Sequence, residues 1–441
     1  MTPDTFDPSA FTPGVASPCY LTREIPGIGG ELKQRPEDFL VEEVPLYTPS
    51  GQGEHIYLFV EKRGLSTLQL RDTLARHFNV KRQAIGHAGL KDKHAITRQV
   101  ISIHAPGRTP EDFPSFQHDR IQILWVDLHD NKLKRGHLAG NRFSIKVRGV
   151  DPLGVRYAKK ALDLLSRVGV PNRFGSQRFG NQMNNHLVGR ALILNEYQSA
   201  LDLLLSPHPL APKGSVDARE AYAQGEYERA AELMPKVFKI EYHALRALAR
   251  GKTPAEAVGV IDQTAAGFYI SSFQSAIFNQ VLNERVQSGT LDRLEPGDLA
   301  FALKSRNTFP ITPEKLESES QTLESELEKF EISPSGPMWG TSMPRGDGEV
   351  AERELSALAR AGISPKDMEL CEQRDAYPMI GGDRRPLRIP VIDPEVEGGI
   401  DEHGAYIRCA FELPRGSFAT TVMDEVMKTS AMQDLENAHG S

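Results

Sequence analysis

The sequence is poor in cysteine, and its cysteines form no pattern. Only Cys19, Cys371 and Cys409 occur in 441 residues, far apart and odd in number. This spacing excludes a disulfide framework and the paired ligands of a structural zinc site. We therefore expect a protein of the reducing cytoplasm, with no metal.

Several other signatures are absent as well. No apolar run approaches the roughly 18 residues that span a membrane, and residues 1–18 lack the basic start and apolar core of a signal peptide. A Gly-rich phosphate loop, a His-Glu-x-x-His motif and a Gly-x-Ser-x-Gly elbow are also missing. Nucleotide hydrolysis, metal chemistry and that class of serine hydrolase therefore have no support. Apolar and charged contents of 39% and 25% indicate a globular protein.

The charge is negative overall but segregated along the chain. The net charge is −7, yet residues 61–99 carry nine Lys or Arg against three acids, and residues 129–148 carry six against one. Residues 314–331, by contrast, carry seven Glu and two Lys. The basic segments predict a surface that binds a polyanion. The alternative is a set of solvated faces that are unrelated in space.

Asp92 stands at the centre of the first basic segment, in the stretch from Gly86 to Gln99. The two glycines of this stretch favour a loop, and the alternation after Gln99 predicts that the loop leads into a strand. A carboxylate among cations suits a nucleophile or base acting on an anionic substrate, and nearby cations lower its pKa. The cations of the stretch are Lys91, Lys93 and Arg98. The plain alternative is an ordinary surface aspartate.

A second unusual stretch runs from Gly169 to Gly180. Its glycines and Pro171 are incompatible with a helix interior, and phenylalanines alternate with arginines. Such a loop suits base stacking and phosphate contact. The alternative is a structural loop whose phenylalanines fill the core.

The periodicity of the chain predicts an α+β protein. Strands are expected within 31–45 and at 55–61, 99–103, 121–128, 142–150, 387–391 and 405–413, and helices at 67–78, 155–168, 227–234, 242–249, 268–287, 314–330 and 351–361. Residues 333–340 and 392–404 are expected to be irregular. The shift to Ala/Leu-rich helices near 199 and back to strands near 387 predicts an inserted domain.

Four segments together resemble the TruD family of pseudouridine synthases. They run from Pro36 to Glu43, from Ala88 to Thr97, from Pro171 to Gly180 and from Leu413 to Thr420, in the order of the family. The stretch from Gln274 to Arg285 is similar to a further family helix. The resemblance spans residues 25–428. Departures are Arg173, where the family often has Tyr, and Asp424, where many members have Arg.

The resemblance implies a fold and a domain arrangement. It implies a pseudouridine-synthase-type mixed, mostly antiparallel sheet with flanking helices, interrupted by a helix-rich α/β insertion. We accordingly expect a tail at 1–22, a catalytic domain at 23–198 and 388–431, an inserted domain at 199–387 and a tail at 432–441.

The resemblance also implies a reaction and a site. It implies cofactor-free isomerisation of a uridine in tRNA, expected at position 13, with no membrane and no obligatory protein partner. Asp92 matches the catalytic nucleophile of the family; Phe39, Asn172 and Phe418 match residues that hold the target nucleotide, and Lys33 and Phe174 match supporting residues. The alternatives are a synthase acting on another RNA, an RNA-binding protein without catalysis, and a carboxylate glycosidase, for which no motif supplies the second acid.

Overall fold

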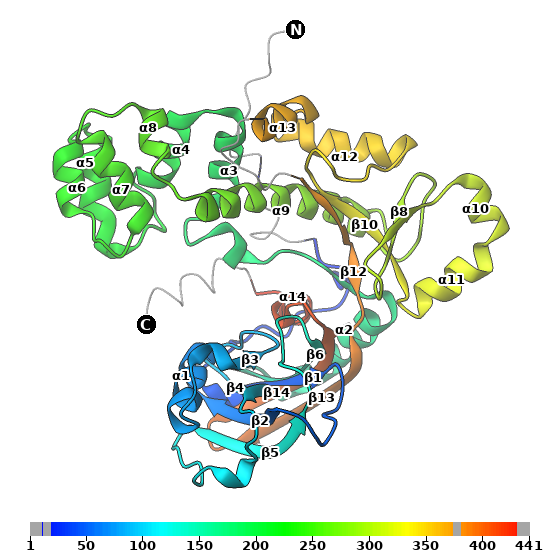
Figure 1. Ribbon diagram of the computed structural model, residues 1–441. Coiled ribbons are helices and arrows are strands. Elements are labelled where there is room, and N and C mark those ends of the chain that lie inside the picture. The colour runs from blue at the N-terminus through cyan, green and yellow to red at the C-terminus, as the bar shows by residue number, and fades with distance from the viewer. Residues whose placement is uncertain (1–10, 12–18, 374–380, 430–441) are drawn as a thin grey trace. The chain divides into compact units, whose positions relative to one another are not determined.

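The computed structural model describes residues 11, 19–373 and 381–429, and the chain forms two compact units (Figure 1). Residues 22–170 and 389–429 make up the first, here called the sheet unit. Residues 171–388 make up most of the second, here called the helical unit, which also includes the described residues 11 and 19–21. The chain crosses between the units at the short strands β7 (Val170–Pro171) and β12 (Arg388–Ile389), which pair with each other.

The sheet unit is built on an eight-stranded mixed sheet. Its order is β13-β14-β6-β1-β4-β2-β5, with β3 added on β4, and every pair is antiparallel except β1 with β4. This confirms the expected α+β class with a mostly antiparallel sheet. The strands are β1 (Phe39–Pro45), β2 (His55–Arg63), β3 (Ile85–His87), β4 (Ile96–His104), β5 (Ile121–His129), β6 (Leu138–Arg148), β13 (Ile392–Asp401) and β14 (Gly404–Pro414).

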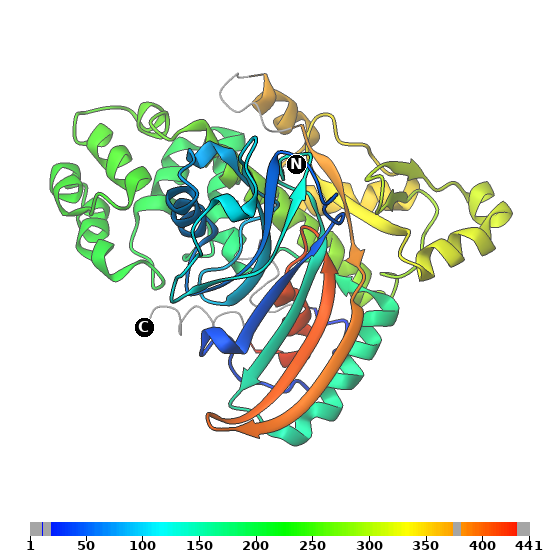
Figure 2. The same cartoon turned by 60° about the horizontal axis from the view of Figure 1, so that its bottom comes forward.

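Three helices accompany this sheet. Helix α1 (Thr67–His77) follows the N-cap residue Ser66, which forms a capping box with Gln69, and buries Leu70 and Leu74 against the apolar side chains of β2 and β4. Helix α2 (Val155–Val168) packs along β13, as Figure 2 shows, and α14 (Ala419–Met427) contacts α2. These helices bury the apolar faces that the alternating strands present.

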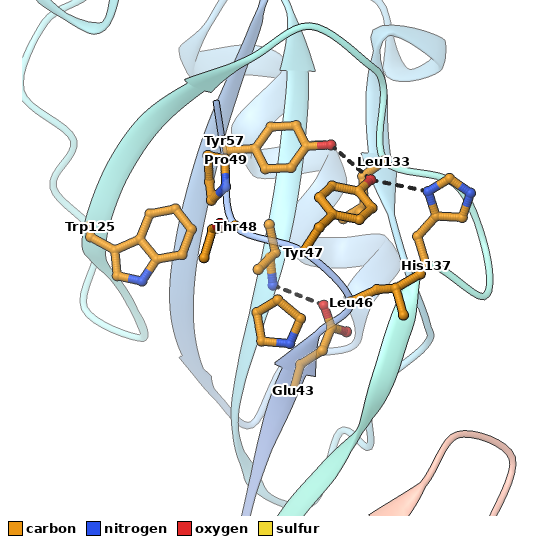
Figure 3. A pocket seen from close by; sticks show the side chains of 11 residues that line it. Glu43, Leu46, Tyr47, Thr48, Pro49, Tyr57, Trp125, Leu133 and His137 are labelled. Carbon is orange, nitrogen blue, oxygen red and sulfur yellow. Dashed lines mark hydrogen bonds between the residues drawn. The ribbon is translucent and has the colours of Figure 1, made fainter. Parts of the chain in front are cut away.

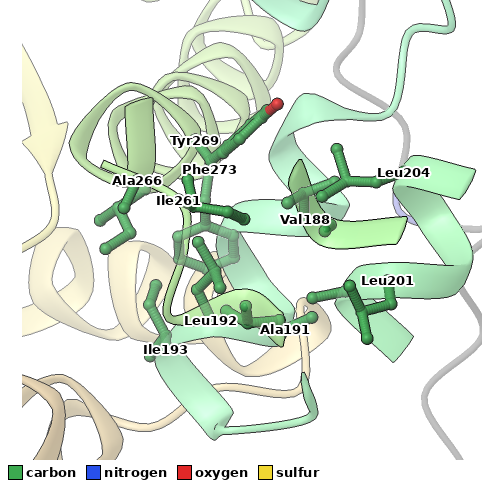
Figure 4. Close-up of a cluster of buried hydrophobic side chains, with 14 of the residues drawn as sticks. Val188, Ala191, Leu192, Ile193, Leu201, Leu204, Ile261, Ala266, Tyr269 and Phe273 are labelled. Atoms are coloured by element: carbon green, nitrogen blue, oxygen red, sulfur yellow. The ribbon is translucent and has the colours of Figure 1, made fainter. Parts of the chain in front are cut away.

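The helical unit surrounds one long helix, α9 (Gln263–Gln287), which confirms the helix predicted at 268–287. Figure 4 shows Val188 and Leu192 of α3 packed towards Phe273 of α9. The other helices are α3 (Asn185–Leu194), α4 (Tyr197–Leu205), α5 (Val216–Ala223), α6 (Tyr227–Leu233), α7 (Lys239–Leu248), α8 (Pro254–Val258), α10 (Pro313–Ser318), α11 (Ser320–Glu328), α12 (Gly348–Arg360) and α13 (Pro365–Glu372). A four-stranded sheet, in the order β11-β10-β8-β9, consists of β8 (Leu299–Ala302), β9 (Thr308–Pro310), β10 (Ile332–Met338) and β11 (Asp383–Pro386).

The first crossing lies earlier in the chain than the expected domain boundary at 198/199. Helix α3 belongs to the helical unit because it packs closely on α9: a Cβ on Gly189 would lie 2.1 Å from the carbonyl oxygen of Tyr269. The second crossing lies between residues 388 and 389. Of the two expected tails, 432–441 lies outside the described residues, whereas Phe11 is buried against His186 and Phe273.

Two stretches expected to be irregular are strands. Residues 332–338 form β10, between β8 and β11, although Pro334 and Pro337 lie within it. Residues 392–401 form β13, whose acidic side chains are tolerated because it is an edge strand paired only with β14. Among the described residues, no helix combines the length and apolar character needed to cross a membrane.

Candidate active site

Asp92 lies in the loop between β3 and β4, and its side chain is 35% exposed. The ammonium of Lys33, which comes from a distant segment of the chain, forms an ion pair with its carboxylate. The main-chain N–H of His94 donates to the other carboxylate oxygen at 3.0 Å. Both carboxylate oxygens are therefore held, while the group stays accessible to solvent.

The pKa of Asp92 is lower than that of an ordinary aspartate. Burial raises it, but the hydrogen bond and charge of Lys33, together with the donor from His94, lower it further than burial raises it. The lowered pKa was predicted, but its main source was not. Of the cations predicted to lower it, Lys91 pairs with Glu43, and Arg98 of β4 pairs with Glu42 and Glu61.

Lys33 joins Asp92 to Phe39. Its ammonium lies 4.5 Å from the centre of the Phe39 ring, a cation–π contact. Phe39 begins β1, is only 5% exposed and packs edge-on against Phe143. The φ of Lys33 is +57°, in the left-handed region that lysine rarely adopts. The backbone of Lys33 is thus held in an unfavourable conformation at the point where its side chain reaches the loop.

Phe418 is a large apolar side chain exposed to solvent in the same unit. It precedes α14 as its N-cap residue and is 55% exposed. The turn before it contains Gly416, whose φ of +81° favours glycine. An exposed aromatic ring at a helix start is available to stack on a base.

Asn172 and Phe174 belong to the helical unit. The side-chain amide of Asn172 donates to the Pro386 carbonyl at 2.8 Å, and its oxygen accepts from Arg385 at 2.5 Å. One further N–H and one further lone pair remain on this amide. The backbone of Phe174 exchanges two hydrogen bonds with the side chain of Asn279 on α9.

The structure thus brings together three of the six predicted residues, Asp92, Lys33 and Phe39. Phe418 lies in the same unit, whereas Asn172 and Phe174 lie in the other. That all six surround one nucleotide stays a prediction.

Arg385 was not predicted from the sequence. Its guanidinium lies 4.2 Å from the centre of the Phe174 ring, and burial lowers its pKa to about 10, with the charges of Arg178 and Arg306 acting in the same direction. Arg178 lies 5.6 Å from the same ring. Two arginines therefore flank Phe174. Only Arg178, which is part of the predicted loop, had a signal in the sequence.

A separate pocket lies in the sheet unit and does not include Asp92. Figure 3 shows the hydroxyl of Tyr47 directed towards Tyr57 and His137, at 3.4 Å and 3.1 Å. Glu43 lines the pocket and lies 3.1 Å from the ammonium of Lys91. The surface of this pocket is largely aromatic and aliphatic.

The described part of the chain contains no cluster of three or more His, Cys, Asp or Glu side chains arranged to hold a metal ion. Its most distinctive chemical group is the paired, ionised carboxylate of Asp92 on a loop of the mixed sheet. A carboxylate of this kind, on a loop beside a mixed α+β sheet, has the chemistry of a nucleophile or a base.

Comparison with known proteins identifies the family. The family model described as tRNA pseudouridine synthase D (TruD) matches residues 16–426. The protein of that name from Geobacter sulfurreducens is 42% identical over 411 residues, which are 93% of this chain and 96% of the relative. The protein of the same name from Thermus thermophilus is 33% identical over 418 residues, which are 95% of this chain and 94% of the relative.

A solved structure agrees with these relatives. A crystal structure from Methanosarcina mazei that carries the same name superposes with a TM-score of 0.83 at 27% identity, covering 96% of this chain and 99% of the other. The chain belongs to the TruD family of tRNA pseudouridine synthases.

Proposed function

We propose that this protein converts the uridine at position 13 of tRNA to pseudouridine, without a cofactor and with Asp92 as the nucleophile. The observation that carries the proposal is the Asp92 carboxylate itself: it is ionised, partly exposed and held by Lys33 over Phe39. We further infer that the enzyme acts in the cytoplasm, where its three free cysteines remain reduced.

The reaction is an isomerisation, so the substrate supplies every atom of the product. The bond between the ribose and N1 of uracil breaks, the base turns, and a bond between the ribose and C5 forms. C5 loses a proton and N1 gains one, and no electrons enter or leave. An ionised carboxylate can attack the substrate covalently while the base is detached.

The target base must first leave the RNA stack, which costs a few kcal/mol. The exposed ring of Phe418 can offset this by stacking, about 1–3 kcal/mol per base. Asn172 has the remaining donor and acceptor needed to read the uracil edge. Phe39 is buried, so we assign it to the floor of the site, beneath Lys33 and next to the nucleotide.

The test is incubation of purified protein with unmodified tRNA, without added metal or cofactor, followed by mapping of pseudouridine. We expect modification at position 13. Asp92→Asn should reduce turnover about 10³-fold or more while tRNA binding is retained, because the amide keeps the shape of the side chain but is not a nucleophile. Asp163→Asn on α2, which removes an exposed acid of the same unit, is the matched control.

Three results would count against this proposal in different ways. Undiminished turnover in Asp92→Asn would show that Asp92 is not the nucleophile. Modification of tRNA at a position other than 13 would show that position 13 is not the target. Modification of another RNA in place of tRNA would favour a related synthase with a different substrate.

A further inference from the structure

Lys62 is a charged side chain buried inside the sheet unit. It lies on β2, is 0% exposed, and faces the uncharged Thr97 of β4 and Ile121 of β5. Its ammonium donates to two main-chain carbonyls, that of Leu65 at 2.5 Å and that of Asp92 at 2.9 Å. Among the described residues, no carboxylate side chain lies within ion-pair distance of it.

Two more buried polar side chains hold the same loop. The hydroxyl of Thr67, at the start of α1, accepts from the main-chain N–H of Lys91 at 2.9 Å and donates to Gln99 at 3.0 Å. The amide of Gln99 donates in turn to the carbonyl of Gly89 at 3.5 Å. Lys62, Thr67 and Gln99 together, here called the loop cradle, come from three elements and fix the backbone at residues 89, 91 and 92.

The loop cradle is costly in stability. Burying an ammonium without a carboxylate partner is unfavourable, and a well-packed apolar side chain is often as stable or more stable at such a place. The hydrogen bond from Lys62 to the Asp92 main-chain carbonyl offers a functional reason for this cost in stability, because the carbonyl and the carboxylate belong to the same residue. A shift of about 1 Å in a reacting group can cost about 100-fold in rate.

We propose that Lys62 is a positioning residue for Asp92, holding the loop backbone so that the carboxylate meets the substrate in the productive orientation. This inference rests on the proposed function of Asp92. It goes beyond that function, because Lys62 acts through the backbone and not by contact with the nucleotide.

The charge state of Lys62 should make activity depend on pH, and this dependence tests the positioning role. Burial lowers the pKa of Lys62 to about 8; the Asp92 charge raises it and the Lys91 charge lowers it. As the pH rises through about 8, the ammonium loses a proton and its hold on the Asp92 carbonyl weakens. Activity should fall over this interval.

The free energy of unfolding should change with pH in the opposite direction to activity. The pKa of Lys62 in the folded protein lies below its ordinary value of 10.5, so between about 8 and 10.5 the unfolded chain binds more protons. The contribution of this group to the free energy of unfolding therefore rises with pH while activity falls. A purely structural lysine would not separate the two quantities in this way.

The experiment compares Lys62→Met, Lys62→Arg and Thr67→Val with the full-length wild type. We expect the single-turnover rate of Lys62→Met to fall about 10- to 100-fold at pH 7, with the Kd for tRNA unchanged and without the alkaline limb assigned to Lys62. Lys62→Arg should keep its charge above pH 8 and recover part of the rate. Thr67→Val removes a second anchor without removing a charge and should lower the rate in the same way.

Leu58→Ala is the matched control, because Leu58 lies on the same strand as Lys62 and its truncation weakens the core without removing a hydrogen bond to the loop. It should lower the melting temperature and leave the rate of the folded fraction unchanged. Equal single-turnover rates in wild type and in both Lys62→Met and Thr67→Val would overturn the inference. Wild-type protein that makes no pseudouridine would instead overturn the proposed function.

Discussion

At the scale of single residues, Lys33 does most to set the chemistry of Asp92. It contributes the hydrogen bond and charge that lower the pKa of the carboxylate, and it rests on the ring of Phe39. Its left-handed backbone conformation costs of order 1–3 kcal/mol and persists only where the surroundings impose it. Such strain is concentrated at functional sites, which agrees with the role proposed for Lys33.

We expect Lys33→Gln to raise the pKa of Asp92, because burial continues to raise it while the main opposing cause is lost. A carboxylate with a lowered pKa stabilises the fold above its ordinary pKa, and this stabilisation is lost as the pH falls through the folded value. The substitution therefore shifts both the acid limb of activity and the acid loss of stability to higher pH. Single-turnover rates and urea unfolding between pH 3 and 7 measure the two shifts.

Lys93→Gln is the control for this prediction. It removes an exposed cation from the same loop that is not among the causes of the Asp92 shift. An acid limb that stays in place in Lys33→Gln, or that moves equally in Lys93→Gln, would contradict the assignment.

The sequence pointed to Asp92 but not to Lys62 or Arg385, for a physical reason. Lysine and arginine are almost always exposed, so a pattern of residue types assigns them to the surface unless a partner is known. The partners of Lys62 are main-chain carbonyls, and that of Asp92, which is 30 residues away in the chain, comes close only in the folded sheet unit. Asp92 was recognisable because its neighbours in the chain form a motif.

At the scale of elements, strands with unusual composition were the hardest to predict. Strand β10 contains two serines, a glycine and two prolines, and strand β13 is acidic, so neither shows an apolar alternation. Each is a strand because its neighbours supply the pairing. Helices α1 and α2, whose apolar stripes and caps are local, were predicted to within a residue.

The glycines around the Asp92 loop test how tightly this element is packed. Gly86 lies in β3, where a Cβ would stand 2.2 Å from the Leu133 carbonyl oxygen, whereas at Gly89 the nearest atom is 3.9 Å away. We expect Gly86→Ala to lower the free energy of unfolding by about 1–3 kcal/mol, because the obstructing atom belongs to the backbone. Gly89→Ala should change it by less than about 0.5 kcal/mol.

Urea unfolding followed by circular dichroism measures both changes. The two substitutions are chemically identical and three residues apart, so their difference isolates the packing at Gly86. Equal losses of stability would show that the loop, and not the contact with Leu133, determines the effect.

At the scale of the whole molecule, the predicted site draws on both units. Asp92, Lys33, Phe39 and Phe418 belong to the sheet unit, and Asn172 and Phe174 to the helical unit. If Asn172 and Phe418 hold the same nucleotide, removing one side chain changes the free energy that the other contributes to holding that nucleotide. Residues in contact through a shared partner couple by about 0.5–3 kcal/mol, whereas distant residues add within about 0.3–0.5 kcal/mol.

We therefore expect Asn172→Ala and Phe418→Ala to be non-additive in kcat/KM for tRNA, with the double variant losing less than the sum of the single losses. Phe418 is largely exposed, so its removal should leave the melting temperature nearly unchanged. The control cycle pairs Phe418→Ala with Glu352→Ala, an exposed acid on α12 of the helical unit. Additive losses in both cycles would mean that the two units do not act on one nucleotide, and the site would then consist of the sheet unit alone.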